Sequence, residues 1–297
     1  MSSPDERRFQ AKHLYDLDES LRFVPLGAYD PTCRRAPGAF WKAGRTPAGP
    51  VALELQRTED GLLARAFGPG AAWVLERTPA LAGLRDEPSR FAPPPGRLAT
   101  LARRGRGLHL PCSPFVFDAL TGVILQQRVA WRDATRAHRR LVTDFGEPAP
   151  GPFGLKLPLS PRQWLRLSGE DLRRAGVDGQ RARALRSAAR QARVVDSAFD
   201  RSLDEARVLL ARVPGCGPWS VEMTLGFGLG DPDAAIVGDL HLPRLVAWAL
   251  AGETEGDDAR MLALLEPHRP HRFRLVRLLY AAGVGASLSS RARAGVR

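Results

Sequence analysis

Cysteine, lysine and long apolar runs are all scarce in this sequence. Its 297 residues include three cysteines, Cys33, Cys112 and Cys216, and none belongs to a Cys-x-x-Cys pair. This odd count argues against a disulfide framework or a structural zinc site, and too few cysteines are present for a four-cysteine iron–sulfur cluster. No stretch approaches the roughly 18 consecutive apolar residues of a membrane span, and the polar residues 1–10 hold no signal-peptide core. We therefore expect a cytoplasmic protein.

Positive charge, by contrast, is abundant. The formal net charge is +12, and arginine supplies nearly all of the basic residues, since lysine occurs only at positions 12, 42 and 156. A balance this basic suggests a polyanionic partner, of which nucleic acid is the usual one. Richness in Arg, Ala, Gly and Pro is equally what a GC-rich genome produces, so charge alone leaves both interpretations open. The 44% apolar and 26% charged composition is typical of a globular protein.

The first third of the sequence indicates a mixed structure. Apolar residues alternate over 51–55, which is the period of a half-buried strand. Asp60-Gly61 follows as a hairpin signal, and 63–67 continues as the return strand. The segment 71–84 is typical of a short helix that is interrupted near Pro79.

A run of prolines, Pro93 to Pro95, followed by Gly96 separates this part from a region of helical patterns. We predict a small α+β domain with an antiparallel sheet over 1–98, an all-helical domain over 99–285 and a tail over 286–297. The expected helices lie near 115–127, 131–145, 168–176, 180–194, 203–213, 240–250, 257–265 and 271–282, and a further helix is expected to begin at Pro161 after an N-cap at Ser160.

The most informative segment joins two of these amphipathic helices. In Val213-Pro-Gly-Cys-Gly-Pro-Trp219, glycines at 215 and 217 permit a tight hairpin with positive φ and close approach to a ligand. The next helix begins at Pro218, and its free N–H groups and positive dipole end can hold a phosphate. A plain turn between two helices is the competing interpretation, because Gly-x-Gly alone is common.

An acidic residue follows the hairpin by some twenty positions. Asp239 lies between the apolar run 236–237 and a helix start, where an aspartate is usually an N-cap. Taken with the hairpin, however, the segment 209–244 resembles the helix-hairpin-helix DNA glycosylases, whose Gly-x-Gly hairpin is followed by a catalytic aspartate. Further similarity runs through 107–115 with 124–127, 167–188, and 269–272 with Tyr280. The small first domain further resembles that of the bacterial inducible 3-methyladenine DNA glycosylases.

The resemblance implies that the enzyme turns a damaged base out of the duplex into a cleft. Asp239 would then stabilise the oxocarbenium-like charge on the sugar or activate water, and the amides of Gly215 and Gly217 would hold the phosphate backbone. The side chain that fills the gap in the duplex matches Gln127 or Arg128. A solvated charge at a helix end is the alternative for Arg128.

The reaction subclass and the pocket follow from the same comparison. Bifunctional members carry a nucleophilic lysine where this chain has Trp219, so a monofunctional enzyme that leaves an abasic site is expected. The base pocket would consist of Trp219, Met223 and His271. The resembled enzymes stack aromatic rings on cationic alkylated purines, and Trp219 matches one such ring. Met223 stands where a second aromatic residue is expected and His271 where a tryptophan is expected, so a less aromatic pocket is implied. Met223 and Phe227 are alternatively core residues, and His271 alternatively a surface or capping histidine.

The expected partner is double-stranded DNA with damaged bases, bound by a monomer associated with the nucleoid, with no metal, no cofactor and no membrane. Arg132, Arg136 and Arg181 are candidates for further phosphate contacts. Three alternatives stay open: a non-catalytic protein that binds damaged DNA, a glycosylase for deaminated or oxidised bases, and a basic helical protein that binds RNA.

Overall fold

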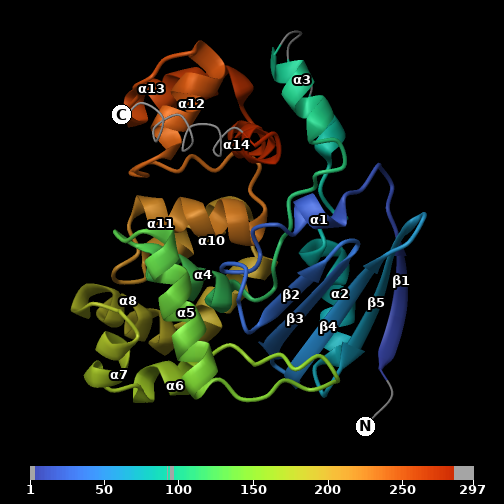
Figure 1. The fold of residues 1–297 in the computed structure, drawn as a ribbon, viewed down its shortest axis with the longest axis vertical. Helices are drawn as coiled ribbons and strands as arrows, with labels where there is room; N and C mark the ends of the chain where they lie inside the picture. Colours follow the sequence, from blue (N-terminus) through green and yellow to red (C-terminus); the bar gives the residue numbers. More distant parts are fainter. Residues whose placement is uncertain (1–3, 92, 94–96, 284–297) are drawn as a thin grey trace, which may run out of the picture.

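The structure, a computed structural model, describes residues 4–91, 93 and 97–283, and the predicted tail 286–297 lies outside them. It joins a five-stranded sheet to a larger group of helices, which confirms the predicted mainly helical fold with an N-terminal antiparallel sheet (Figure 1). The first elements are β1 (Asp5–Gln10), α1 (Leu17–Ser20), β2 (Cys33–Ala36), β3 (Ala39–Thr46), β4 (Gly49–Arg57), β5 (Gly61–Phe67) and α2 (Ala71–Leu81). The central helices are α3 (Arg97–Arg104), α4 (Val116–Gln126), α5 (Trp131–Phe145), α6 (Pro161–Arg166), α7 (Gly169–Arg174), α8 (Gly179–Arg190) and α9 (Ala192–Asp196). The last are α10 (Leu203–Ala211), α11 (Pro218–Met223), the π-helix η3 (Thr224–Gly228), α12 (Leu242–Ala251), α13 (Asp258–Leu265) and α14 (Arg272–Ala281).

The sheet is antiparallel throughout, with strand order β1-β5-β4-β3-β2. The predicted hairpin at Asp60-Gly61 joins β4 to β5. The expectation that β4 is half-buried is wrong: Leu53 and Ala52, which point to opposite faces, are both almost fully buried. A central strand covered on both sides has no solvent face, and its Glu54 accepts a hydrogen bond from the indole of Trp41 at 3.0 Å.

Two predicted helix boundaries also differ from the structure. Helix α2 runs through Pro79 to Leu81 without interruption. Pro79 lies near the C-terminal end, so few hydrogen bonds remain beyond it to be lost. The single helix expected over 180–194 divides at Gln191 into α8 and α9, because Gln191 leaves helical geometry with φ −108°.

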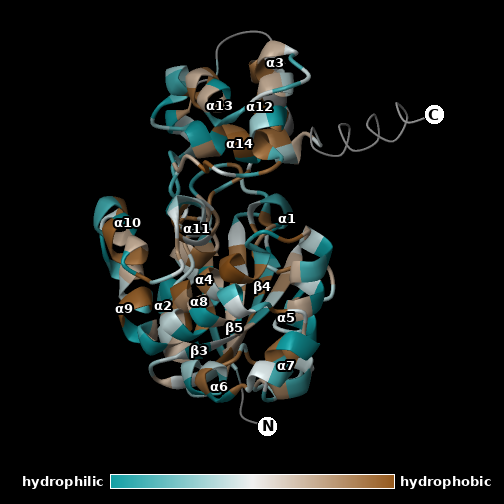
Figure 2. Ribbon diagram, turned by 90° about the vertical axis from the view of Figure 1, so that its left-hand side faces the viewer, coloured by the Kyte–Doolittle hydropathy of each residue, from teal (hydrophilic) through white to brown (hydrophobic). Residues whose placement is uncertain are grey.

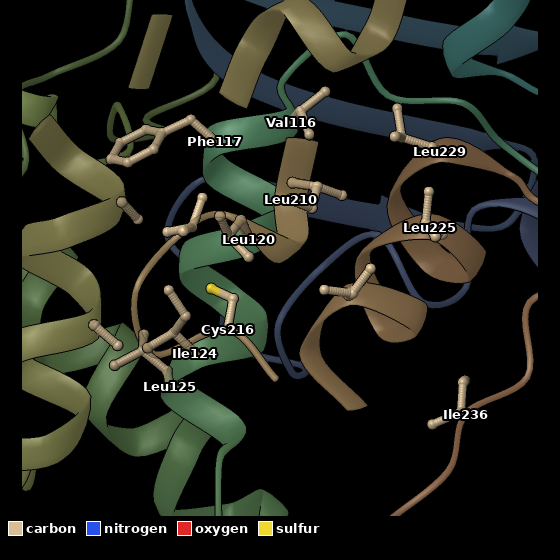
Figure 3. Packing of buried hydrophobic residues seen from close by; sticks show 14 of the residues in the cluster. Val116, Phe117, Leu120, Ile124, Leu125, Leu210, Cys216, Leu225, Leu229 and Ile236 are labelled. Atoms are coloured by element: carbon tan, nitrogen blue, oxygen red, sulfur yellow. The ribbon is translucent and has the colours of Figure 1, made fainter. Parts of the chain in front are cut away.

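Helix α4 is the central element of the helical region. Its buried face, which includes Leu120 and Ile124 at 0% exposure, packs among residues of α8, α10 and η3, as Figure 3 shows. The start of this helix reaches the sheet, because Phe115 belongs to the apolar cluster that α2 and the strands share. A side chain at Gly44 of β3 would clash with the Phe115 ring, so the close approach requires glycine there. The position of α4 is therefore fixed from both sides.

Helices α12, α13 and α14 stand with α3 above the rest of the molecule in both ribbon views (Figure 1 and Figure 2). The connection to them runs from the end of η3 at Gly228 to the start of α12 at Leu242. Asp239 lies in this connection. The N-terminal segment after α1 also reaches the upper group, where Phe23 contacts Tyr280 of α14 with ring centroids 5.4 Å apart.

Candidate functional site

The two carboxylate oxygens of Asp239 accept hydrogen bonds from different elements. Its Oδ1 accepts hydrogen bonds from the backbone N–H groups of His241 at 2.9 Å and Leu242 at 2.8 Å, at the start of α12. Its Oδ2 accepts a hydrogen bond from Nε1 of Trp219 at 3.1 Å. The sequence leaves helix capping and a position in a reactive site as competing interpretations of Asp239, and the geometry combines them. The capping bonds fix the orientation of the carboxylate, and the indole bond ties it to the hairpin.

The loop that carries Asp239 is also bound to α13. Gly238 adopts φ +80°, a conformation that favours glycine, and its N–H donates to the carboxylate of Asp258 at 2.8 Å. Asp258 is the first residue of α13, so the loop is attached to both upper helices that follow it. Rigid support of this kind is what a positioned reactive group requires.

The hairpin between α10 and α11 has the predicted tight geometry, with one correction. Gly215 has φ +92°, and a Cβ there would lie 2.5 Å from the Cβ of Ala184. Gly217 has φ −80° and open space around its Cα, so only the first glycine needs the left-handed conformation. Cys216 points into the core, and burial raises the pKa of its thiol to about 12, so it is an unreactive packing residue.

The turn after α4 brings its two predicted residues together, but in different environments. The amide of Gln127 donates to the carbonyl of Gly215 and to the hydroxyl of Ser220, both at 2.9 Å. Gln127 thus holds the hairpin against α4. Arg128 is exposed and has φ +56°, which is uncommon for a residue other than glycine. The unusual backbone turns Arg128 outward at the rim of the cleft.

A cleft of about 1320 Å³ lies between these elements. Trp219, Met223 and Asp239 all line it, so the structure brings these three predicted residues together. Met223 and Phe227 also pack against the helical core, so both interpretations of this helix face hold. The π-helical turn η3 that follows Met223 is an irregularity often found at functional sites.

Two aromatic residues of the cleft come from distant parts of the chain. Phe23 follows α1, and its ring lies 5.4 Å from those of Phe227 and Tyr280. Burial, and then the nearby charge of Asp239, raise the pKa of Tyr280 to about 12, so its hydroxyl stays protonated. Sequence reasoning missed Phe23, because it lies in an irregular segment without periodicity. It noted Tyr280 only as part of the last helix.

His271, by contrast, does not line this cleft, and the prediction that it shares a pocket with Trp219 is wrong. Helix α14 turns Val276 and Tyr280 toward the cleft. His271 is the N-cap residue of α14, is 9% exposed, and packs on Phe91 with ring centroids 5.5 Å apart. Burial lowers its pKa, as expected for a packed, neutral histidine. His271 thus occupies the N-cap position without capping the helix through its side chain, which is packed in the interior.

The far end of the cleft is polar. Lys42 of β3 is 7% exposed and holds its ammonium 5.2 Å from the ring centroid of Phe115. Burial alone would lower the pKa of Lys42, but Cys33, Asp118 and other acidic groups raise it, so the ammonium stays charged. Burial raises the pKa of Asp118 to about 6 against the effect of Lys42. Sequence reasoning missed this group, because nothing in a strand pattern shows that Lys42 faces a cleft.

The three arginines proposed for phosphate contacts divide into two kinds. Arg132 and Arg136 are exposed on α5. Arg181 is 4% exposed, pairs with Asp178 at 2.7 Å and donates to the carbonyl of Leu125. Arg181 therefore joins α8 to α4 and is not available to DNA.

The arrangement places a fixed carboxylate beside a large cleft with aromatic walls, next to an exposed hairpin. A carboxylate held this way can stabilise positive charge that develops on a bound sugar, or orient a water molecule. Among the described residues, no group of three or more His, Cys, Asp or Glu side chains could hold a metal ion. In the same part of the chain, no helix is long and apolar enough to cross a membrane.

Solved structures of DNA glycosylases have the same fold as this chain. A similar solved structure is the 3-methyladenine DNA glycosylase from Archaeoglobus fulgidus, with a TM-score of 0.78 and 21% identity, covering 93% of this chain and 98% of that one. The 8-oxoguanine glycosylase/lyase from Clostridium acetobutylicum has a TM-score of 0.68 and 12% identity, covering 94% and 98%. Since one fold serves both, the fold does not identify the substrate.

Sequence comparison is more specific. The probable bifunctional transcriptional activator/DNA repair enzyme AlkA from Mycobacterium tuberculosis is 30% identical over 157 residues, which are 52% of this chain and 31% of that protein. The match therefore spans about a third of that relative's length. Residues 121–270, half of the chain, match the family described as HhH-GPD superfamily base excision DNA repair protein. This matched segment contains the turn after α4, the hairpin and Asp239, and the chain belongs to the HhH-GPD superfamily of base excision DNA repair proteins.

Proposed function

We propose that this protein is a monofunctional DNA glycosylase that hydrolyses the N-glycosidic bond of alkylated purines of the 3-methyladenine type in duplex DNA. The observation that carries the proposal is the orientation of Asp239, whose Oδ2 lies at the cleft beside Trp219 while Oδ1 is held by α12. The similarity to the M. tuberculosis DNA repair enzyme supports a role in DNA repair. We place a monomeric enzyme on chromosomal DNA in the cytoplasm.

In this mechanism the damaged nucleotide leaves the base stack and enters the cleft. Exposed amides of the hairpin, at Gly215 and Gly217, bind the phosphate backbone without reading sequence. Arg128 fills the space left in the duplex, because it is exposed at the rim whereas Gln127 is engaged with the hairpin.

The carboxylate of Asp239 then stabilises the oxocarbenium-like sugar as the bond to the base breaks, and it orients the water that replaces the base. Trp219 stands where bifunctional relatives carry a nucleophilic lysine, so no covalent enzyme–sugar intermediate forms at this position. Lys42 remains charged in its aromatic and acidic surroundings, and a protonated amine is not a nucleophile. The product is an abasic site.

The test is release of free bases from methylated duplex DNA, detected by mass spectrometry, for the parent and Asp239→Asn. The asparagine keeps an acceptor oxygen for the N–H groups of His241 and Leu242, so folding is preserved while the charge is lost. Asp257→Asn is the matched control, because Asp257 caps α13 outside the cleft.

We expect release of 3-methyladenine or 7-methylguanine by the parent and by the Asp257→Asn control, and none by Asp239→Asn at equal DNA affinity. Tight duplex binding without release of any base from methylated DNA contradicts the alkylpurine assignment. Substrates with deaminated or oxidised bases would then be tested, and inactivity on those as well would indicate a non-catalytic protein that binds damaged DNA.

A further inference from the structure

A buried arginine that forms no ion pair with any described residue lies behind the rings of Phe23 and Phe227, which line the cleft. Arg277 of α14 is 1% exposed, and its Nη2 donates to the carbonyls of Glu19 at 3.1 Å and Ser20 at 3.4 Å. Its Nε and Nη1 are buried and have no hydrogen-bond partner among the described residues. Burial lowers its pKa to about 10, so the guanidinium keeps its charge at neutral pH. An isolated charge at such a depth calls for a compensating interaction.

Two aromatic rings supply that interaction. The guanidinium carbon of Arg277 lies 4.9 Å from the ring centroid of Phe23 and 5.8 Å from that of Phe227. Both rings line the cleft, whereas Arg277 does not, so the rings stand between the charge and the cleft. Arg22 places a second guanidinium 5.5 Å from the same Phe23 ring.

The contact with Arg277 affects how strongly the rings of Phe23 and Phe227 can attract a cationic base. An aromatic ring attracts a cation through the negative potential of its faces. A ring already in contact with Arg277 offers less of that potential to a second cation. Direct repulsion acts in the same direction: a base stacked on Phe23 at a usual ring separation lies about 9 Å from the guanidinium, which at an effective dielectric near 20 disfavours a positive base by about twentyfold.

We propose that Arg277 is a specificity-determining residue: among the damaged purines that the cleft accepts, it lowers the advantage of purines with a formal positive charge over neutral damaged bases such as deaminated purines. The inference rests on the proposed glycosylase function, and concerns which bases that site prefers. Arg277 acts through Phe23 and Phe227, without touching the substrate.

The experiment compares single-turnover release of a cationic base and a neutral one from duplexes that are otherwise identical. One duplex carries 7-methylguanine, in slightly acidic buffer where this base holds its full charge, and the other carries hypoxanthine. Arg277→Met removes the charge and keeps an unbranched apolar stem. Arg277→Lys keeps the charge. Arg181→Met is the control, because Arg181 is an equally buried arginine paired with Asp178 away from these rings.

We expect the ratio of 7-methylguanine to hypoxanthine release to rise about twentyfold in Arg277→Met and to stay within about twofold of the parent in the Lys variant and the control. General structural damage slows both substrates and leaves the ratio unchanged. Arg277→Gln, which retains a donor for the Glu19 carbonyl, gives the same ratio test if the Met variant does not fold.

An unchanged ratio in the neutral variants, or an equal rise in Arg277→Lys, overturns the inference while leaving the proposed function standing. Failure of the parent to release either base instead overturns the proposed function, and the inference with it.

Discussion

The hydrogen bond from Trp219 to Asp239 offers a direct test of how the carboxylate works. Trp219→Phe keeps an aromatic ring in the cleft and removes only the donor that binds Oδ2 at 3.1 Å. A hydrogen bond to a charged group contributes about 1.5–3 kcal/mol. At about 1.4 kcal/mol per factor of ten, its loss should slow base release roughly 10- to 100-fold. The length of this bond favours the lower half of that range.

The assay is single-turnover release of 3-methyladenine or 7-methylguanine at saturating enzyme. DNA affinity should change by less than about twofold, because the glycines proposed to bind phosphate, Gly215 and Gly217, are unaltered. Folding stability should also hold, since the Oδ1 cap on α12 does not involve Trp219. Trp73→Phe is the matched control: Trp73 packs on Phe115 beside the sheet, outside the cleft. A Trp219→Phe rate within twofold of the parent would refute the idea that the indole positions the carboxylate.

Two further predictions concern the hairpin and the polar end of the cleft. Gly215→Ala forces a side chain into a left-handed backbone 2.5 Å from Ala184, which should destabilise the fold by at least about 1–2 kcal/mol and weaken duplex binding in a fluorescence-anisotropy titration. Gly217→Ala, at φ −80° with open space, should behave as the parent, and equal effects of the two substitutions would disprove this account. The pKa of Asp118 is raised to about 6, so its contribution to stability is present below its unfolded pKa and is lost as the pH rises through 6. Urea unfolding should show the parent losing up to about 3 kcal/mol relative to Asp118→Asn between pH 4 and pH 8, and parallel pH profiles would contradict the assignment.

The sequence predicted well those features that depend on neighbouring residues. The helices expected to begin after Ser160 and near 168 both start with a capping box in the structure, because a cap and the first turn are adjacent in the chain. The hairpin at Gly215 follows from local backbone geometry in the same way, whereas Gly217 shows that the glycine pattern alone overstates the need for positive φ.

The sequence was least informative where distant segments meet. His271 and Tyr280 belong to one helix, and only the packing of α14 against α1 and η3 decides which of them faces the cleft. Nothing local distinguishes Arg181, which joins two helices in the core, from the exposed Arg136. Burial is a property of the assembled fold, and the residues next to an arginine in the sequence do not show whether it will be buried.

By itself, the sequence determined the helical class and the hairpin, because short-range periodicity, capping and glycine placement are set within a few residues. The catalytic role of Asp239 follows from the family resemblance and stays a prediction. Tertiary structure alone decided that the Asp239 carboxylate divides its two oxygens between a helix start and Trp219, some twenty residues away in the chain. It alone placed Phe23 in the cleft and Arg277 behind it. These contacts join opposite ends of the chain, and they form only when the core of α4 brings the sheet and the last helix to the same place.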